Sequence, residues 1–172
     1  MVSSKTSDMA ANPLSAMEFR HALGQFTTGV TVVTAERAPG RVHGMTANSF
    51  ASVSLDPPLI LICVDQRAHL LPMVRAQKRF GVSVLKEDQR AMSEYFAQTE
   101  ENAETEERLG VRFGWTPSGI PVLEDTLAQL GCNVVASYVS GDHTVFIGEV
   151  ETAKIHSGEP LLFFGGQYRQ IR

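Results

Sequence analysis

The sequence predicts a mainly β protein, an antiparallel barrel with helical additions, built as one domain. At least six segments are rich in apolar and β-branched residues, as strands are, and turn signals such as Pro39-Gly40 and Gly141-Asp142 separate neighbouring segments. Only two or three segments have apolar residues at helical spacing. The 172 residues suit a single domain, and the dominance of hairpin connections favours an antiparallel sheet that closes on itself.

Composition and charge exclude several classes of protein. Apolar residues make up 43% and charged residues 20%, as in ordinary globular domains and unlike disordered chains. The formal net charge of −4 gives no electrostatic footprint for nucleic acid or for an anionic membrane. The longest purely apolar run, 59–64, is far shorter than the roughly 18 residues of a membrane span. We therefore expect neither a nucleic-acid nor a membrane partner.

Residues 1–14 are predicted to be a flexible N-terminal tail, and residues 15–172 the folded domain. The tail is rich in Ser, Ala and Asn and lacks the apolar stretch of a secretory signal. The two cysteines, Cys63 and Cys132, lie in apolar segments and are interpreted as reduced, buried thiols. Together these features predict a cytoplasmic protein.

The folded domain is predicted to begin with a capped helix and a hairpin. Ser15 and Glu18 have the spacing of a capping box, and apolar residues then recur at helical spacing, so that one face of the helix is apolar. Residues 30–34 are β-branched and form a strand, and residues 42–45 begin its partner after a Pro-Gly turn.

The middle of the chain is predicted to hold a bend, a buried strand and two helices. Pro57 and Pro58 bend the chain, because proline cannot sit in a central ladder. Residues 59–64 form a strand that we expect to be buried on both faces. The remaining predicted elements are a helix over 69–79, a strand over 80–85, a helix over 88–98, a solvated glutamate-rich helix extension or loop over 99–107, and strands over 130–138, 144–155 and 160–168.

Several common sites are absent from the sequence. It contains neither the glycine-rich dinucleotide or phosphate loops G-x-G-x-x-G and G-x-x-x-x-G-K nor the nucleophile motif G-x-S-x-G. The five histidines lack Cys, Asp or Glu residues at the spacing of metal ligands, so no metal site is expected.

The polar run over residues 44–58 is the strongest candidate for a binding site. It places hydroxyls, one side-chain amide and small-residue backbone between a hairpin and an apolar strand. Such a stretch can approach a flat heterocycle or a phosphate closely, because no bulky side chain intervenes. A serine-rich loop that satisfies its own turns has the same composition, so the residues alone leave both interpretations open.

Continued to Asp65, this run resembles the signature of flavin reductases of the FMN-binding split-barrel fold. Further segments match the same family in order: 19–34, 80–85, 119–123, 141–144 and 148–150. The resemblance covers roughly residues 17–169. It implies a Greek-key-like antiparallel split β-barrel.

The resemblance also implies which residues hold the cofactors. On the flavin side these are Thr46, Ala47, Asn48 and Ser49 at the edge of the isoalloxazine ring, Ser52 and Ser54 towards the ribityl and phosphate part, Cys63, Val64 and Asp65 along the cleft, and Phe80, Val82 and Ser83 as a further wall. On the nicotinamide side these are His143 as the catalytic residue, Gly141 and Asp142 beside it, Tyr168 holding the dinucleotide, and Thr28 with Gly29. From the residues alone, an exposed histidine is the commonest outcome at the His143 turn, and Tyr168 could equally be a core or interface aromatic.

The implied activity is that of an NAD(P)H:flavin oxidoreductase. Hydride passes from NADH or NADPH to FAD or FMN, and the reduced flavin diffuses to a flavin-dependent monooxygenase; the family also implies a homodimer. NADH is favoured over NADPH, because Asp142 would repel a 2′-phosphate. Arg67 or His69 could receive a phosphate, which leaves FAD and FMN both open.

Two alternatives share the fold. One is an oxidase of the pyridoxamine-phosphate type, in which the Gly-Asp-His sequence at 141–143 has no explanation. The other is a non-catalytic flavin- or haem-binding module without nicotinamide chemistry.

Overall fold

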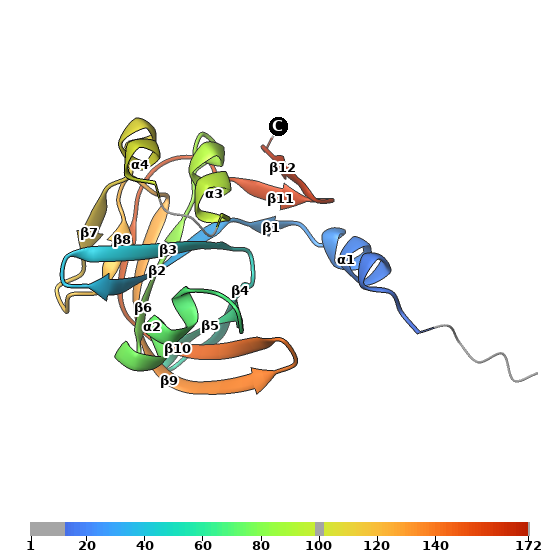
Figure 1. The fold of residues 1–172 in the computed structure, drawn as a ribbon, viewed down its shortest axis with the longest axis horizontal. Coiled ribbons are helices and arrows are strands. Elements are labelled where there is room, and N and C mark those ends of the chain that lie inside the picture. The colour runs from blue at the N-terminus through green and yellow to red at the C-terminus, as the bar shows by residue number, and fades with distance from the viewer. Residues whose placement is uncertain (1–12, 99–101, 172) are drawn as a thin grey trace, which may run out of the picture.

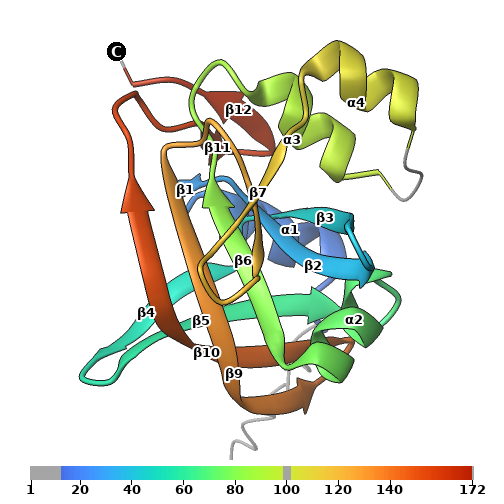
Figure 2. The ribbon, with the colours of Figure 1, turned by 90° about the vertical axis from the view of Figure 1, so that its left-hand side faces the viewer.

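A seven-stranded antiparallel sheet forms the body of the protein. The computed structural model describes residues 13–98 and 102–171, so the expected tail over 1–14 lies almost wholly outside the described residues. The strands of this sheet are β2 (Thr31–Ala38), β3 (Arg41–Ala47), β4 (Phe50–Leu55), β5 (Pro58–Asp65), β6 (Arg79–Val84), β9 (Ala128–Ser140) and β10 (His143–Ile155). Their order is β3-β2-β6-β9-β10-β5-β4, and the sheet curves round a common interior (Figures 1 and 2). The predicted mainly β, antiparallel fold is confirmed.

The predicted hairpins are confirmed, and one of them carries the candidate site. β2 and β3 meet at a turn in which Gly40 has a φ of 73°, a left-handed conformation that favours glycine. β9 and β10 are 13 residues long each and meet at Gly141-Asp142, where Gly141 has a φ of 60°. β4 and β5 meet at the predicted proline bend. The long β9–β10 hairpin thus presents its turn at one end of the barrel.

The expectation that residues 59–64 are buried on both faces was wrong. Ile60, Ile62 and Val64 point into the core, whereas the alternate residues of β5 are only half-buried. Because directly paired strand residues share a face, these alternate residues continue onto β10 and β9. We call this surface the outer apolar face; it consists of Leu61, Cys63, Ala136, Tyr138, Val145 and Ile147.

The predicted single strand over 160–168 was also wrong. It is a hairpin of β11 (Leu162–Phe164) and β12 (Gln167–Arg169), turned at Gly165 and Gly166, both at positive φ. β11 also pairs with β1 (Thr28–Gly29), which makes a small three-stranded sheet. A further two-stranded sheet joins β7 (Phe113–Trp115) to β8 (Pro121–Leu123).

The two helices predicted over 69–79 and 88–98 are present, and each buries apolar residues. α2 (Leu70–Gln77) buries Leu70, Leu71 and Val74 in the main core. α3 (Arg90–Phe96) buries Met92, Tyr95 and Phe96 in a second core under β2 and β8.

The glutamate-rich segment forms a separate short helix, α4 (Ala103–Leu109), rather than an extension of α3. α4 buries no residue, in agreement with the predicted solvated character, but it is tied to α3 because the Tyr95 hydroxyl donates to the Glu106 carboxylate at 2.7 Å. Residues 99–101 of the predicted segment lie outside the described residues. Among the described helices, none is long and apolar enough to cross a membrane.

Helix α1 (Ala16–Gly24) has the predicted capping box but no buried residue. The Glu18 amide donates to Ser15 Oγ at 3.2 Å, and the Ser15 amide donates to the Glu18 carboxylate at 2.9 Å. Figure 1 shows α1 projecting from the barrel. Its apolar side chains therefore face solvent in a single chain: Phe19 is 50% and Leu23 58% exposed, and Phe26, just after the helix, is 76% exposed.

Candidate functional site

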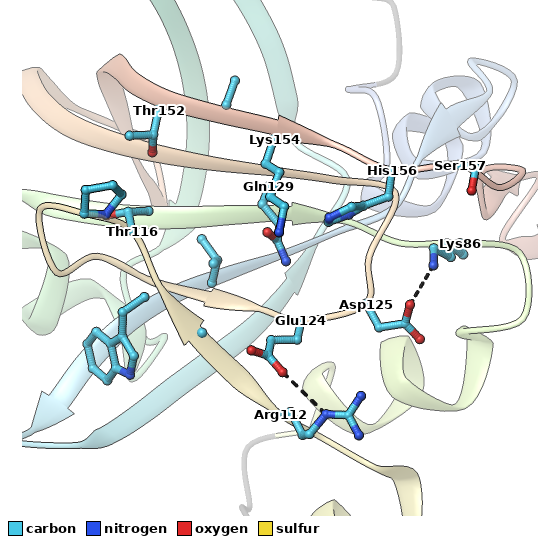
Figure 3. A pocket seen from close by; sticks show the side chains of 15 residues that line it. Lys86, Arg112, Thr116, Glu124, Asp125, Gln129, Thr152, Lys154, His156 and Ser157 are labelled. Carbon is cyan, nitrogen blue, oxygen red and sulfur yellow. Dashed lines mark hydrogen bonds and ion pairs between the residues drawn. The ribbon is translucent and has the colours of Figure 1, made fainter.

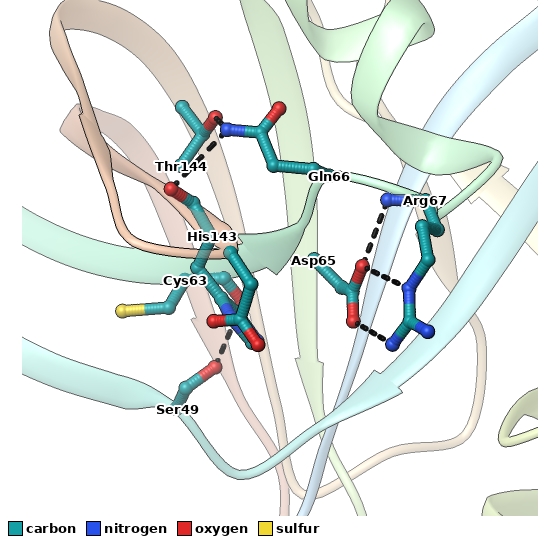
Figure 4. A network of polar contacts seen from close by, with 8 residues as sticks. Ser49, Cys63, Asp65, Gln66, Arg67, His143 and Thr144 are labelled. Carbon is teal, nitrogen blue, oxygen red and sulfur yellow. Dashed lines mark hydrogen bonds and ion pairs between the residues drawn. The ribbon is translucent and has the colours of Figure 1, made fainter.

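The end of β5 and the turn of the β9–β10 hairpin bring several predicted site residues together. In the pairing of β10 with β5, His143 lies opposite Asp65. Next to them, the Ser49 hydroxyl donates to the Cys63 carbonyl at 3.0 Å, and the Cys63 amide donates to the Ser49 carbonyl at 3.3 Å (Figure 4). The polar run, the apolar strand and the Gly-Asp-His turn, which are distant in sequence, thus meet at one end of the barrel.

Two residues that the sequence analysis missed hold the turn in place. The Gln66 amide donates to the Asp142 carbonyl at 2.9 Å, and its side chain donates to Thr144 Oγ1 at 3.0 Å. The Arg75 guanidinium, reaching from α2, donates to the same Thr144 oxygen at 3.0 Å. No sequence motif marks Gln66 or Arg75, because their contacts depend on β5, α2 and β10 being packed together.

The charged groups of the site form two close pairs. Arg67 donates to both carboxylate oxygens of Asp65 at 2.8 and 3.1 Å, and these hydrogen bonds, with that from the Arg67 backbone amide, hold the pKa of Asp65 well below its usual range. Asp142 Oδ1 lies 2.7 Å from His143 Nδ1, and this hydrogen bond lowers the pKa of Asp142. Both carboxylates are therefore ionised at neutral pH.

The pairing with Asp142 also orients the His143 ring. A carboxylate accepts hydrogen bonds, so Nδ1 carries the proton and Nε2 is left with its lone pair in the neutral ring. The side chain of His143 is 42% exposed, so a ligand can reach it. His143 can thus offer an acceptor to a ligand while its ring stays anchored.

The prediction of two buried thiols is confirmed for Cys132 but was wrong for Cys63. Cys63 is half-buried, and desolvation raises the pKa of its thiol. Burial raises the pKa of the Cys132 thiol to about 12. Both cysteines are free and stay protonated at neutral pH, which fits packing rather than nucleophilic roles.

The predicted wall formed by Phe80, Val82 and Ser83 was wrong. All three have no exposed surface, because β6 lies between β2 and β9 and is covered by β8. The Ser83 hydroxyl accepts a hydrogen bond from the Leu123 amide of β8 at 2.9 Å. Val64 is also fully buried, so its side chain is a core residue and does not line the cleft.

The polar run divides into exposed and engaged side chains. Asn48 is exposed, and its amide has no hydrogen-bond partner within residues 13–98 and 102–171. The Thr46 hydroxyl, by contrast, donates to the Ser93 carbonyl at 2.7 Å, and Ala47 is only 9% exposed. Of these three, Asn48 is therefore the side chain that can meet a flavin ring directly.

Ser52 and Ser54 lie towards the far end of β5 from His143. Ser54 pairs with Leu59 and Ser52 with Ile60, whereas Asp65 pairs with His143. At about 3.3 Å per residue, the six steps from Leu59 to Asp65 span about 20 Å. The two serines would therefore contact another part of an elongated ligand than His143 does, as the resemblance implies.

The remaining predicted residues meet in the small sheet. Thr28 pairs with Phe163, which pairs in turn with Tyr168, so Thr28, Gly29 and Tyr168 belong to one three-stranded unit. The Thr28 hydroxyl oxygen is buried and has no hydrogen-bond partner in the described part of the chain. An orphaned buried hydroxyl is costly, so its hydrogen-bond partner is expected to lie outside the described residues.

A cavity of about 860 Å³ lies elsewhere, between β7, β8 and the far ends of β9 and β10 (Figure 3). None of the predicted site residues lines it. Lys86 is paired with Asp125 at 2.8 Å and Arg112 with Glu124 at 3.4 Å, so two of its cations are already neutralised. The candidate site of the sequence analysis is therefore separate from this cavity and lies at the Asn48–His143 end of the barrel. Among the described residues, no group of three or more His, Cys, Asp or Glu is arranged to hold a metal ion.

Comparison with known proteins points to the same chemistry. Residues 23–172 match the model of the flavin reductase like domain. The chain is 41% identical over 160 residues to an NADH-dependent flavin reductase of Rhodococcus, which covers 92% of this chain and 88% of the relative. It is 39% identical over 154 residues to the reductase component of 4-hydroxyphenylacetate 3-monooxygenase of Thermus thermophilus, covering 89% and 95% of the two chains.

A solved structure extends the similarity to three dimensions. The NADH:FAD oxidoreductase SgcE6 of Streptomyces globisporus, in complex with NAD and FAD fragments, superposes with a TM-score of 0.83 at 38% identity. The match covers 94% of this chain and 95% of that one.

Proposed function

This chain belongs to the family of flavin reductase like domains, and from that premise we propose that it is an NADH-dependent flavin reductase. It would take FAD or FMN and supply the reduced flavin to a partner monooxygenase. The observation that carries the proposal is the meeting of the polar run, the end of β5 and the His143 turn at one end of the barrel. The relatives reported above are named as reductases, which supports this proposal. None of these names supports an oxidase of the pyridoxamine-phosphate type or a non-catalytic binding module.

The donor set suits a flavin. When bound together, the flavin and the reduced nicotinamide supply the redox chemistry, in which a hydride moves from nicotinamide C4 to flavin N5. The Asn48 amide would orient the ring and stabilise the negative charge that develops on its pyrimidine edge. His143 Nε2 would accept a hydrogen bond from the nicotinamide carboxamide. The chain's task is to align two rings at about 3–3.5 Å and to exclude water.

The charge at the turn supports NADH over NADPH. Asp142 is exposed, and its lowered pKa keeps it ionised at neutral pH, so it would repel a 2′-phosphate. Arg67, whose charge interacts with that of Asp142 across the turn, is held by Asp65. Arg67 is therefore already neutralised and is not free to pair with a 2′-phosphate.

An anaerobic assay tests the activity. Protein, a large excess of flavin and NADH are mixed without oxygen, and the absorbance near 450 nm is followed. Bleaching of many flavins per protein supports the reductase, whereas NADH that stays unoxidised rules it out. Bleaching that stops at one flavin per protein would favour a module that holds its flavin.

The outer apolar face and α1 support a homodimer. The face is apolar along three adjacent strands and ends at His143. α1 exposes Phe19 and Leu23, and no residue of the described part of the chain covers them. A second copy could cover both surfaces, because each copy offers one helix and one face. A mass near twice 18.8 kDa in light scattering would agree with this, and a monomer at micromolar concentration would not.

We also propose that the protein is cytoplasmic, because two free thiols remain reduced in that compartment.

The substitution Asn48→Ala is expected to weaken flavin binding threefold to tenfold. It removes one neutral hydrogen bond, worth about 0.5–1.5 kcal/mol, and leaves a small side chain on an exposed position. Quenching of flavin fluorescence measures the affinity. Asn133→Ala is the control. It deletes a side-chain amide of β9 that donates to Glu151 of β10, away from the polar run. Equal affinities of the two variants would mean that the polar run is only a turn.

The substitution His143→Ala is expected to lower kcat/KM for NADH by about threefold to tenfold while flavin affinity stays nearly intact. A contact made equally in the ground and transition states raises KM alone, and one that aligns the rings lowers kcat as well. Steady-state rates at saturating flavin separate the two. His156→Ala is the matched control, since this histidine lies at the other end of β10 and contacts the Thr126 carbonyl. A wild-type rate for His143→Ala would make His143 an ordinary turn residue.

A further inference from the structure

Ser93 is a buried polar residue that links two parts of the candidate site. It lies on α3 and has no exposed surface. Its hydroxyl is 2.9 Å from the Tyr168 hydroxyl of β12, and either group can donate the hydrogen bond. Its carbonyl accepts the hydrogen bond of the Thr46 hydroxyl at 2.7 Å. One residue thus contacts both the start of the polar run and the C-terminal hairpin, 47 residues before it and 75 residues after it in sequence.

Tyr168 is held at three points of its side chain. Besides the hydrogen bond to Ser93, the Arg90 guanidinium lies 5.3 Å from the centre of the tyrosine ring, over its face. Phe163 packs edge to face at 5.4 Å between ring centres. Arg90 and Ser93 are three residues apart on α3 and therefore lie on the same side of the helix. α3 thereby fixes both the ring and the hydroxyl of Tyr168.

The fixed tyrosine still borders open space. Tyr168 lines a cavity of about 650 Å³ together with Arg90, Leu161 and Arg169. A ligand that enters this space meets a ring whose orientation α3 has already set. The same helix receives Thr46, so the positions of the polar run and of Tyr168 are not independent.

We propose that Ser93 is a positioning residue of the reductase, holding Tyr168 in fixed relation to Thr46 of the polar run. The proposal rests on the proposed function, in which the polar run faces the flavin and Tyr168 the dinucleotide. Ser93 touches neither ligand and acts through Tyr168. A rigid tyrosine matters here because hydride transfer needs the two rings aligned to within a fraction of an ångström.

The test is a double-mutant cycle with Ser93→Ala and Tyr168→Phe. Tyr168→Phe keeps the ring and its stacking with Arg90 and deletes only the hydroxyl. Each single variant is expected to lower kcat/KM for NADH by threefold to tenfold at saturating flavin, since each removes the same hydrogen bond. The double variant should then be no worse than the poorer single one, because the bond is lost only once. Ser137→Ala, an exposed serine on β9, is the control.

The outcomes separate this proposal from the proposed function. A wild-type protein that does not oxidise NADH with flavin contradicts the function itself. An active wild type whose Ser93→Ala variant melts normally and keeps its kcat/KM contradicts the positioning role, as do single effects that multiply in the double variant. If Ser93→Ala does not fold, Tyr168→Phe decides alone: an unchanged kcat/KM overturns the proposal, and a threefold to tenfold loss supports it.

Discussion

Replacing Phe80 by alanine is expected to lower the free energy of unfolding by about 3–5 kcal/mol. The ring is fully buried in the main core and fills the space left by the missing side chain of Gly148, where an added Cβ would lie 2.6 Å from the ring. Truncation leaves a cavity that the surrounding strands cannot close. Chemical denaturation measures the loss, and flavin affinity of the folded protein should stay within about twofold of the wild type.

Leu55→Ala is the control for this variant. Leu55 lies at the β4–β5 turn and is 94% exposed, so its truncation should change stability by no more than about 0.5 kcal/mol. The opposite pattern for Phe80→Ala, with stability retained and flavin affinity lost, would return Phe80 to the cleft wall that the family resemblance implies.

The substitution Gly81→Ala is expected to destabilise the protein by about 3 kcal/mol or more, although it adds a single methyl group. A Cβ at this position would collide with the Pro121 carbonyl of β8 and would lie 2.5 Å from Thr34 Oγ1. The carbonyl belongs to the backbone and cannot rotate away, and it already accepts the Thr34 hydroxyl at 2.6 Å. β8 and β6 would have to separate to admit the methyl group.

The matched control for Gly81 is Gly29→Ala. Gly29 lies in β1, and an added Cβ there would meet no atom within 4 Å. Thermal unfolding of the two variants should therefore differ strongly, with Gly29→Ala close to the wild type. Similar midpoints would contradict the close approach of β8 to β6.

Local features of the fold could be predicted from the sequence. The capping box at Ser15 and the turn at Gly141 depend on residues that are neighbours in the chain, and both are present. The hairpin at Gly165-Gly166 had an equally local signal, two adjacent glycines, which the sequence analysis did not use. The faces of β5 and β6 could not be predicted this way, because they depend on which strands cover them.

The candidate site also has features that the sequence could predict and features that depend on packing. The motif residues Asn48, Asp65 and His143 do lie around one end of the barrel, although they are far apart in sequence. The motif could not indicate which side chains are turned inward, so Val82 was placed in the cleft although it is core. Gln66 and Arg75 carry no local signal, because their role arises only when α2 packs beside the β10 strand.

The capping box of α1 also affects how tightly two copies would associate. A nine-residue helix is marginal in water by itself, and the reciprocal bonds of Ser15 and Glu18 favour the helical state before any contact is made. The conformational entropy of ordering this arm is then lost during folding and not at the encounter, which is the benefit of preorganisation. An N-cap stabilises a helix by about 1 kcal/mol, so removing it would weaken the docking of α1 on the other copy by about fivefold. A symmetric dimer contains two such helices, so the loss would apply twice.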